Sequence, residues 1–241
     1  MTTLSGIGLT KRYGDHEVVR SIDLEVHPAE VVGLLGPNGA GKTTTFNMFA
    51  GGVRPSGGQV FLGETEITDL PMYRRARLGI TYLPQEPSIF RKLSVADNVN
   101  AILETVEANR TVRRERLREL LAELGLTEKA GRRGDSLSGG ERRRVEITRA
   151  LVLDPKFMLL DEPFAGIDPI AVSDIQKIIE QLKSRGIGVV ITDHSVRETL
   201  SICDRAYIIK DGAIVRQGPP EEIAADPKVR EIYLGENFRL G

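Results

Sequence analysis

The sequence is poor in cysteine, in long apolar runs and in net charge. The single cysteine, Cys203, excludes an internal disulfide framework and suits a reducing compartment. No apolar run approaches the roughly 18 residues of a membrane span, and the N-terminus lacks the basic and apolar segments of a signal peptide. With 33 Lys and Arg against 34 Asp and Glu, charge alone gives no reason to expect a nucleic-acid partner. If the protein acts at a membrane, another chain must supply the span.

The most informative stretch is a glycine-rich segment, residues 36–44, which fits the phosphate-loop pattern G-x-x-x-x-G-K-[ST]. The apolar run 31–35 before it predicts a buried strand, and residues 43–50 predict the start of a helix. Glycines let backbone N–H groups close around phosphate oxygens, and a helix N-terminus adds partial positive charge. Lys42 would reach the β- and γ-phosphates, and the Thr43 hydroxyl would bind Mg²⁺. The predicted contacts with the nucleotide are Gly36, Pro37, Asn38, Gly39, Ala40, Gly41, Lys42, Thr43 and Thr44.

Helical and strand patterns alternate along most of the chain, which predicts an α/β fold with a mostly parallel sheet. Residues 4–26 instead predict antiparallel strands with a turn at Gly14-Asp15, and residues 55–58 predict a loop. Residues 94–153 are helical in pattern. We therefore expect one domain over 1–241, in which a helical subdomain of 94–153 is inserted into an α/β core of 1–93 and 154–241.

Polar residues follow three predicted strands. The continuous apolar run 157–160 ends in Asp161-Glu162, where doubly wound sheets bind their ligands. Asp161 would hold Mg²⁺ through water, and Glu162 would face an attacking water as general base. The strand 189–193 delivers His194 to the same edge, where it could contact a γ-phosphate. Gln85 follows the strand 80–83 and could reach Mg²⁺ or a water, although a plain loop residue is the default for a lone glutamine.

Two further features have more than one interpretation. Residues 137–141 read Leu-Ser-Gly-Gly-Glu before a helix expected from about Arg142, and they could form a second anion site or only a helix cap at Ser138. Tyr13 lies before the predicted turn, where an aromatic ring could pack against the sheet or stack on a purine.

With the phosphate loop, residues 137–141 and Asp161-Glu162 present in this order, the chain resembles an ABC-type ATPase subunit over essentially its whole length. The resemblance implies a P-loop NTPase (RecA-like) core that binds ATP and Mg²⁺. Further positions resemble named elements of the family: Gln85 the Q-loop, residues 165–168 the D-loop, His194 the switch histidine, and Tyr13 the aromatic residue that stacks on adenine.

The resemblance also implies a homodimer that holds two ATP molecules head to tail. Each phosphate loop would be completed by Ser138, Gly139 and Gly140 of the other copy, with Asp168 of the D-loop close by. Closure would depend on the γ-phosphate, so nucleotide state would drive a large motion through differential contacts.

Within the family, residues 82–95, 141–147, 164–170 and 233–240 resemble the ATPase subunits of lipopolysaccharide exporters. Ser195 departs from that pattern, because Asn is expected after the switch histidine. The resemblance implies a peripheral subunit on the cytoplasmic face of an inner membrane, bound to two integral membrane subunits. Its ATP cycle would power lipopolysaccharide extraction toward the outer membrane. Phe90 and Arg91 would line the groove that receives the membrane subunits, unless Phe90 is ordinary core.

Three other functions would account for parts of the sequence. A branched-chain amino-acid importer ATPase has similar sequence, but the tail 233–240 and the Phe90-Arg91 pair argue against it. A soluble ABC ATPase of DNA repair or translation usually carries zinc modules, coiled coils or tandem cassettes, and the sequence contains no such segment. A P-loop GTPase or small-molecule kinase leaves residues 137–141 and His194 unexplained.

Overall fold

A six-stranded sheet runs through the middle of the molecule in the computed structural model, which describes residues 2–240. Its strand order is β10-β9-β3-β8-β7-β6, and every pair is parallel except β10 with β9. The strands are β3 (Val31–Leu35), β6 (Ile80–Leu83), β7 (Phe157–Asp161), β8 (Gly188–Thr192), β9 (Arg205–Lys210) and β10 (Ala213–Gly218). The predicted α/β fold with a mostly parallel sheet is confirmed.

Both faces of this sheet are buried, which explains the continuous apolar runs. Along β7, Met158 and Leu160 face one hydrophobic cluster, whereas Phe157 and Leu159 face another. The first cluster contains the apolar stripe of α6 (Pro169–Ser184), and the second contains that of α1 (Lys42–Ala50). Because successive side chains of a strand point to opposite faces, the sheet is held between these two layers.

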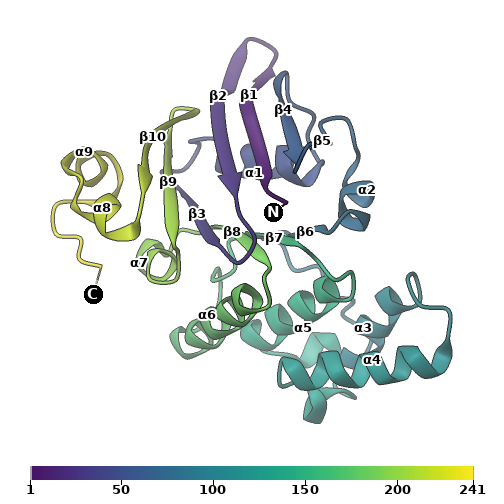
Figure 1. The fold of residues 1–241 in the computed structure, drawn as a ribbon. Helices are drawn as coiled ribbons and strands as arrows, with labels where there is room; N and C mark the ends of the chain where they lie inside the picture. The colour runs from purple at the N-terminus through teal and green to yellow at the C-terminus, as the bar shows by residue number, and fades with distance from the viewer. Residues whose placement is uncertain (1, 241) are drawn as a thin grey trace.

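A smaller antiparallel sheet, with strand order β2-β1-β4-β5, crosses α1 in the view of Figure 1 and shares a hydrophobic cluster with it. Its strands are β1 (Leu4–Tyr13), β2 (His16–Val26), β4 (Gly57–Leu62) and β5 (Thr65–Glu66). The predicted antiparallel strands and the turn at Gly14-Asp15 are confirmed. The loop predicted at 55–58 is wrong at its end, because Gly57 already pairs with Thr10 of β1.

Three helices gather at the end of the molecule away from the antiparallel sheet (Figure 1). They are α3 (Val95–Leu103), α4 (Arg110–Glu123) and α5 (Gly139–Leu151), with 3₁₀ turns at Thr127–Lys129 and Gly134–Ser136. The α5 helix begins earlier than the predicted Arg142, because Ser138 caps it. This grouping supports the predicted inserted subdomain, and its bounds of 94–153 stay a prediction.

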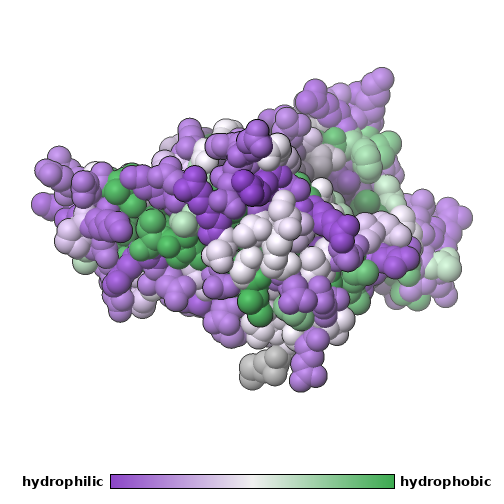
Figure 2. Space-filling view, turned by 90° about the horizontal axis from the view of Figure 1, so that it is seen from above, coloured by the Kyte–Doolittle hydropathy of each residue, from purple (hydrophilic) through white to green (hydrophobic). Residues whose placement is uncertain are grey.

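The remaining helices lie between strands of the two sheets or form the C-terminal end of the chain. They are α2 (Met72–Arg77), α7 (Val196–Leu200), α8 (Pro220–Ala225), α9 (Pro227–Val229) and the turn Arg230–Leu234. No helix among residues 2–240 is long and apolar enough to cross a membrane. Seen from above, this face of the molecule is mostly hydrophilic, with apolar side chains in separate patches (Figure 2).

Candidate active site

The phosphate loop joins β3 to α1 and folds tightly against its neighbours. A Cβ atom at Gly36 would lie 2.0 Å from the Ile209 carbonyl oxygen, so only glycine fits there. Gly41 has φ +102° and precedes α1, a conformation that other residues rarely adopt. Lys42 Nζ donates to the carbonyls of Gly36 and Pro37 at 2.7 and 2.9 Å. Burial lowers the pKa of Lys42, while the nearby carboxylates of Glu162 and Asp161 oppose that shift.

A cavity of about 350 Å³ lies over this loop and is lined by residues from five segments of the chain. It is lined by Val18, Asn38, Gly39, Ala40, Gly41, Lys42, Thr43, Thr44, Gln85, Glu162 and His194. The structure therefore brings the predicted phosphate-contacting residues 38–44 together with three predicted catalytic side chains. This arrangement follows from the sheet, because β3, β6, β7 and β8 all end at this edge.

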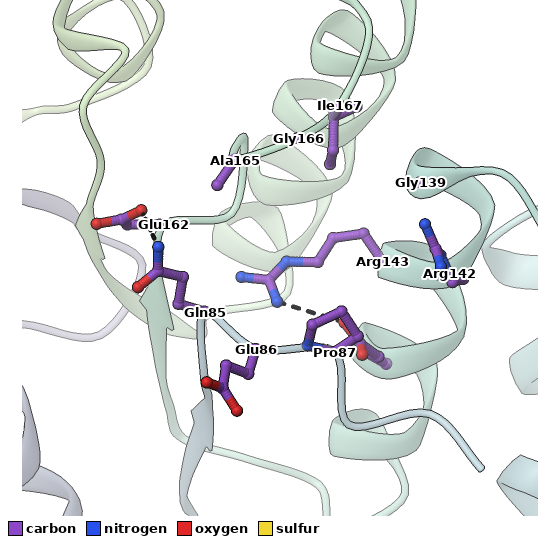
Figure 3. Close-up of a pocket in the computed structure, with 11 residues that line it drawn as sticks. Gln85, Glu86, Pro87, Gly139, Arg142, Arg143, Glu162, Ala165, Gly166 and Ile167 are labelled. Carbon is purple, nitrogen blue, oxygen red and sulfur yellow. Dashed lines mark hydrogen bonds and ion pairs between the residues drawn. The ribbon is translucent and has the colours of Figure 1, made fainter. Parts of the chain in front are cut away.

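Glu162 is held between two of the other predicted residues. Its Oε1 lies 2.7 Å from His194 Nε2, and its Oε2 accepts a hydrogen bond from Gln85 Nε2 at 2.7 Å. Gln85 and Glu162 approach each other from different segments in Figure 3. Glu162 has φ +47°, in the left-handed region that costs a non-glycine residue roughly 1–3 kcal/mol. Its N–H donates to the Thr192 carbonyl at 2.7 Å, which holds the chain in this turn.

Asp161 lies beside this group and is only 2% exposed. Its Oδ2 accepts a hydrogen bond from the Tyr82 hydroxyl at 3.0 Å. Its Oδ1 is buried without a hydrogen-bond partner among residues 2–240. Burial raises the pKa of Asp161, and the Tyr82 hydrogen bond opposes that shift. A buried carboxylate oxygen with free lone pairs, close enough to Lys42 to oppose the lowering of its pKa, fits a divalent cation held directly or through water.

The remaining predicted nucleotide contacts do not line this cavity within the chain that the structure describes. Tyr13 is 51% exposed at the end of β1, with Lys11 Nζ 5.0 Å from its ring centroid. Ser138 caps α5, where its Oγ accepts from the Glu141 N–H at 3.3 Å and its N–H donates to Glu141 Oε2 at 2.8 Å. Asp168 caps α6 in the same way, accepting from the Ala171 N–H at 3.0 Å. Both motif residues thus also stabilise helix N-termini.

A second cavity, of about 450 Å³, separates α5 from the end of β7 (Figure 3). It is lined by Gln85, Glu86, Pro87, Gly139, Arg142, Arg143, Glu146, Glu162, Ala165, Gly166 and Ile167. Gln85 of the predicted Q-loop, residues 165–167 of the predicted D-loop and Gly139 at the start of α5 thus line one cavity. Gly139 lies against the D-loop, because a Cβ there would stand 3.0 Å from the Gly166 carbonyl oxygen.

Several buried polar residues of the site were not predicted. Arg143 donates to the carbonyls of Pro84 and Asp161, each at 3.0 Å, and pairs with Glu146 at 3.3 Å. Glu146 Oε1 accepts from the Ser88 N–H at 2.6 Å. The pair therefore ties α5 to the segment after β6 and to the end of β7. The only sequence signal for it is the spacing of three residues on one helix.

Asp193 is also buried, and the sequence pattern identifies it only as the end of a strand. Its two carboxylate oxygens accept hydrogen bonds at 2.8 Å from the backbone N–H groups of Phe164 and Ser195. These bonds fix the backbone on both sides of His194 and after Glu162.

Phe90 and Arg91 lie on the surface, outside both cavities. Phe90 is 45% exposed, so its interpretation as ordinary core is wrong. Its ring lies 4.5 Å from the guanidinium of Arg149, which also donates to the Ser88 carbonyl at 2.6 Å. The exposed aromatic ring thus packs against Arg149 of α5, which lies about one helical turn after Glu146 of the buried pair.

Comparisons with known proteins give the same assignment as the site. A family model described as ABC transporter matches residues 19–165, and one described as branched-chain amino acid ATP-binding cassette transporter matches residues 217–239. The chain is 58% identical over 237 residues to the "Lipopolysaccharide export system ATP-binding protein LptB" of Acidithiobacillus ferridurans, covering 98% of each chain.

Two solved structures have the same fold. An ATP-binding cassette of an ABC transporter in its ADP conformation has a TM-score of 0.88 and 29% identity, over 98% of this chain and 100% of that one. A dimeric post-hydrolysis cassette bound to ADP and Pi has a TM-score of 0.79 and 25% identity, over 90% of this chain and 98% of that one. From the family match, the near full-length identity and the phosphate-loop site, we conclude that this chain belongs to the ABC transporter family as an ATP-binding subunit.

Proposed function

We propose that this protein hydrolyses ATP with Glu162 as general base and thereby powers a membrane transporter that exports lipopolysaccharide. The observation that carries the catalytic part is the placement of Glu162 over the phosphate-loop cavity, between Gln85 and His194. A carboxylate that accepts a hydrogen bond from Gln85 and lies against the His194 ring is held in one orientation, as a base that must meet one water molecule requires.

Different residues around the cavity would bind the phosphates, the adenine and the cation. The loop amides and Lys42 would hold the β- and γ-phosphates, and the exposed face of Tyr13 would stack on adenine. Asp161 Oδ1, the Thr43 hydroxyl and the amide oxygen of Gln85 would hold Mg²⁺, which neutralises phosphate charge when it is bound. The Gln85 oxygen stays available because its Nε2 is the atom that donates to Glu162.

Glu162 would accept the proton of the attacking water, and His194 would contact the γ-phosphate. His194 lies 2.7 Å from the Glu162 carboxylate and is half exposed, so it can turn toward a phosphate without unfolding its surroundings. The backbone beside it is fixed by Asp193.

A second copy of the chain would complete the site as a homodimer. Ser138, Gly139 and Gly140 begin α5, whose N-terminus offers backbone N–H groups to an anion, and they do not line the phosphate cavity of their own chain. The dimeric cassette found among the solved structures supports this arrangement. Asp168 caps α6 at the end of the D-loop, and the D-loop residues 165–167 before it line the second cavity, between α5 and the end of β7.

The transport part rests on the relatives and on the surface around Phe90. The near full-length identity to the lipopolysaccharide export protein supports the same cargo and two integral membrane subunits, with peripheral attachment at the cytoplasmic face of an inner membrane. Phe90 and Arg91 present an apolar ring beside a positive charge, which suits a protein interface.

A branched-chain amino-acid importer is the second candidate, and one observation favours it. The family model for branched-chain amino-acid cassettes matches residues 217–239, which include most of the tail. The expectation that the tail separates the two transporters is therefore wrong. The identity over 98% of both chains favours lipopolysaccharide export.

The catalytic proposal is tested with Glu162→Gln. We expect ATP binding to persist, turnover to fall by at least about 100-fold, and an ATP-dependent dimer to accumulate. Turnover is measured by phosphate release, and dimerisation by light scattering. Unchanged turnover in this variant would remove Glu162 as the base.

The cargo is tested by pulling tagged protein out of detergent-solubilised native membranes. Mass spectrometry that identifies two lipopolysaccharide-exporter membrane subunits would support the proposal. Recovery of an amino-acid permease instead would keep the ATPase and overturn the cargo.

A further inference from the structure

Two buried side-chain oxygens, on residues paired across the central strands, have no hydrogen-bond partner among residues 2–240. They are Asp161 Oδ1 at the end of β7 and Thr192 Oγ1 at the end of β8. Thr192 is 1% exposed. The two residues are direct partners across the parallel strands, and the Glu162 N–H donates to the Thr192 carbonyl at 2.7 Å.

Both side chains point to the face of the sheet that α1 covers. Directly opposed residues of neighbouring parallel strands point the same way, and so do residues two positions apart on one strand. Leu159 and Val190, two positions before Asp161 and Thr192, both belong to the hydrophobic cluster that contains Phe46 of α1. The two free oxygens therefore face the helix that begins with Lys42 and Thr43.

Thr192 differs from the other buried threonines of the described chain. Thr45, Thr148 and Thr199 each donate to the carbonyl four residues earlier, at 2.8–2.9 Å, and Thr81 donates to the Phe157 carbonyl at 3.5 Å. Only the hydroxyl of Thr192 has no protein partner within residues 2–240. Buried polar groups without partners are rare and usually bind an ordered water or ion.

The carboxylate of Asp161 indicates which partner the Thr192 hydroxyl binds. The Tyr82 hydroxyl donates to Oδ2 of Asp161, which leaves Oδ1 as the carboxylate oxygen without a partner among residues 2–240. A hydroxyl and a carboxylate oxygen on adjacent strands can hold one water molecule between them, the first accepting or donating and the second accepting. A water bound in this way faces the metal ligands proposed above.

We propose that Thr192 is a positioning residue for the divalent cation of the nucleotide site. Its hydroxyl and Asp161 Oδ1 together hold one water of the cation's hydration shell. Thr192 thus selects the orientation in which Asp161 meets the cation, without contacting nucleotide itself. This inference rests on the proposed function, because it needs a cation beside bound nucleotide.

The test uses Mn²⁺ as the probe, with ADP so that no turnover occurs, and reads Mn²⁺ binding by electron paramagnetic resonance. Thr192→Val removes the hydroxyl at nearly constant volume, and we expect Mn²⁺ to bind roughly tenfold more weakly in the presence of ADP. Thr192→Ser, which keeps the hydroxyl, should bind Mn²⁺ as the wild type does. ADP affinity in EDTA should be the same in all three proteins.

Thr81→Val is the matched control, because it removes a buried strand hydroxyl that has a backbone partner. It should leave Mn²⁺ affinity unchanged. Thr192→Ala removes the same hydroxyl without any bulk and gives a second reading if the valine variant folds poorly. Unchanged Mn²⁺ affinity in the hydroxyl-free variants would overturn the inference, and so would an equal loss of ADP affinity in EDTA. Failure of the proposed function looks different, since the wild type would then bind no ADP.

Discussion

The charged pair of Arg143 and Glu146 lies buried between α5, the segment after β6 and the end of β7. Removing one member leaves the other charge unpaired in the interior, which typically costs about 3–5 kcal/mol. We expect Arg143→Met to lower the free energy of unfolding by about that amount, measured by urea denaturation at neutral pH. Replacing both, as Arg143→Met with Glu146→Leu, should recover most of the loss, because no isolated charge remains buried.

The control for this pair is Arg118→Met on α4, where the arginine is exposed. A surface substitution of this kind should change the stability by no more than about 0.5 kcal/mol. If Arg143→Met were equally mild, the buried pair would not stabilise the fold.

These residues also show where prediction from sequence ended. Lys42, Asp161 and Glu162 could be assigned because a local pattern places them beside a predicted strand end. Arg142 and Arg143 are neighbours of the same type, and only the packing of α5 under the segment after β6 buries the second. The left-handed backbone at Glu162 could not be predicted either. Glycine is the residue that most often adopts this conformation, and a glutamate gives no local signal for it.

At the scale of elements, the start of α5 was predicted three residues too late. Glycine disfavours helix, so Gly139-Gly140 looked like a loop. The capping box of Ser138 and Glu141 outweighs that preference, and Gly140 is needed because a Cβ there would lie 2.7 Å from Cβ of Ala171 in α6. Packing between two helices therefore decided a boundary that residue propensity alone could not.

Glu141 gives this helix start a measurable pH dependence. A hydrogen bond from Lys129, reinforced by the Ser138 backbone N–H, lowers the pKa of Glu141 to about 2. A carboxylate whose pKa is lowered on folding stabilises the fold above its unfolded pKa, near 4.3, and loses that contribution as the pH falls toward 2. We expect Glu141→Gln to melt at a lower temperature than wild type from pH 8 to pH 5, with the difference shrinking below about pH 4. A difference that did not depend on pH would contradict the assignment.

Arg75 joins α2 to the C-terminal end of α1, the helix of the phosphate loop. Its guanidinium donates to the carbonyls of Met48, Phe49, Thr68 and Leu70 at 2.6–2.9 Å. Burial lowers its pKa to about 10, so it stays charged at neutral pH and complements the negative end of the helix.

We expect Arg75→Met to lower the free energy of unfolding by about 3 kcal/mol or more, since several charged hydrogen bonds are lost at once. Arg75→Lys should rescue little, because one ammonium cannot reach four carbonyls around a plane. Chemical denaturation checks both, with the neighbouring exposed Arg74→Met as control. Full rescue by lysine would show that charge alone matters at this position.

At the scale of the whole molecule, the layered architecture was predictable because each layer has its own periodicity. Apolar runs of β3, β7 and β8 require cover on both faces, and the residues that cover them come from α1 and α6. The relation between α5 and the phosphate loop was not predictable from periodicity. Within one chain, Ser138 begins α5 and lies outside the phosphate cavity, so its expected contact with nucleotide needs a second copy.

The requirement for a second copy is tested by introducing a negative charge at position 138 while keeping the helix cap. Asp and Asn are both good N-cap residues, so Ser138→Asp and Ser138→Asn should leave the stability within about 1 kcal/mol of wild type. In the dimer, the aspartate would face the γ-phosphate of the partner's ATP, and two like charges repel strongly where water is excluded. In the Glu162→Gln background, which should preserve ATP, we expect Ser138→Asp to remain monomeric by light scattering while each chain still binds ATP. The Ser138→Asn variant differs from Ser138→Asp only in charge, and we expect it to dimerise more strongly than the aspartate variant. Equal dimerisation of the two variants would mean that Ser138 does not approach phosphate, and the completed site would have to be sought elsewhere on α5.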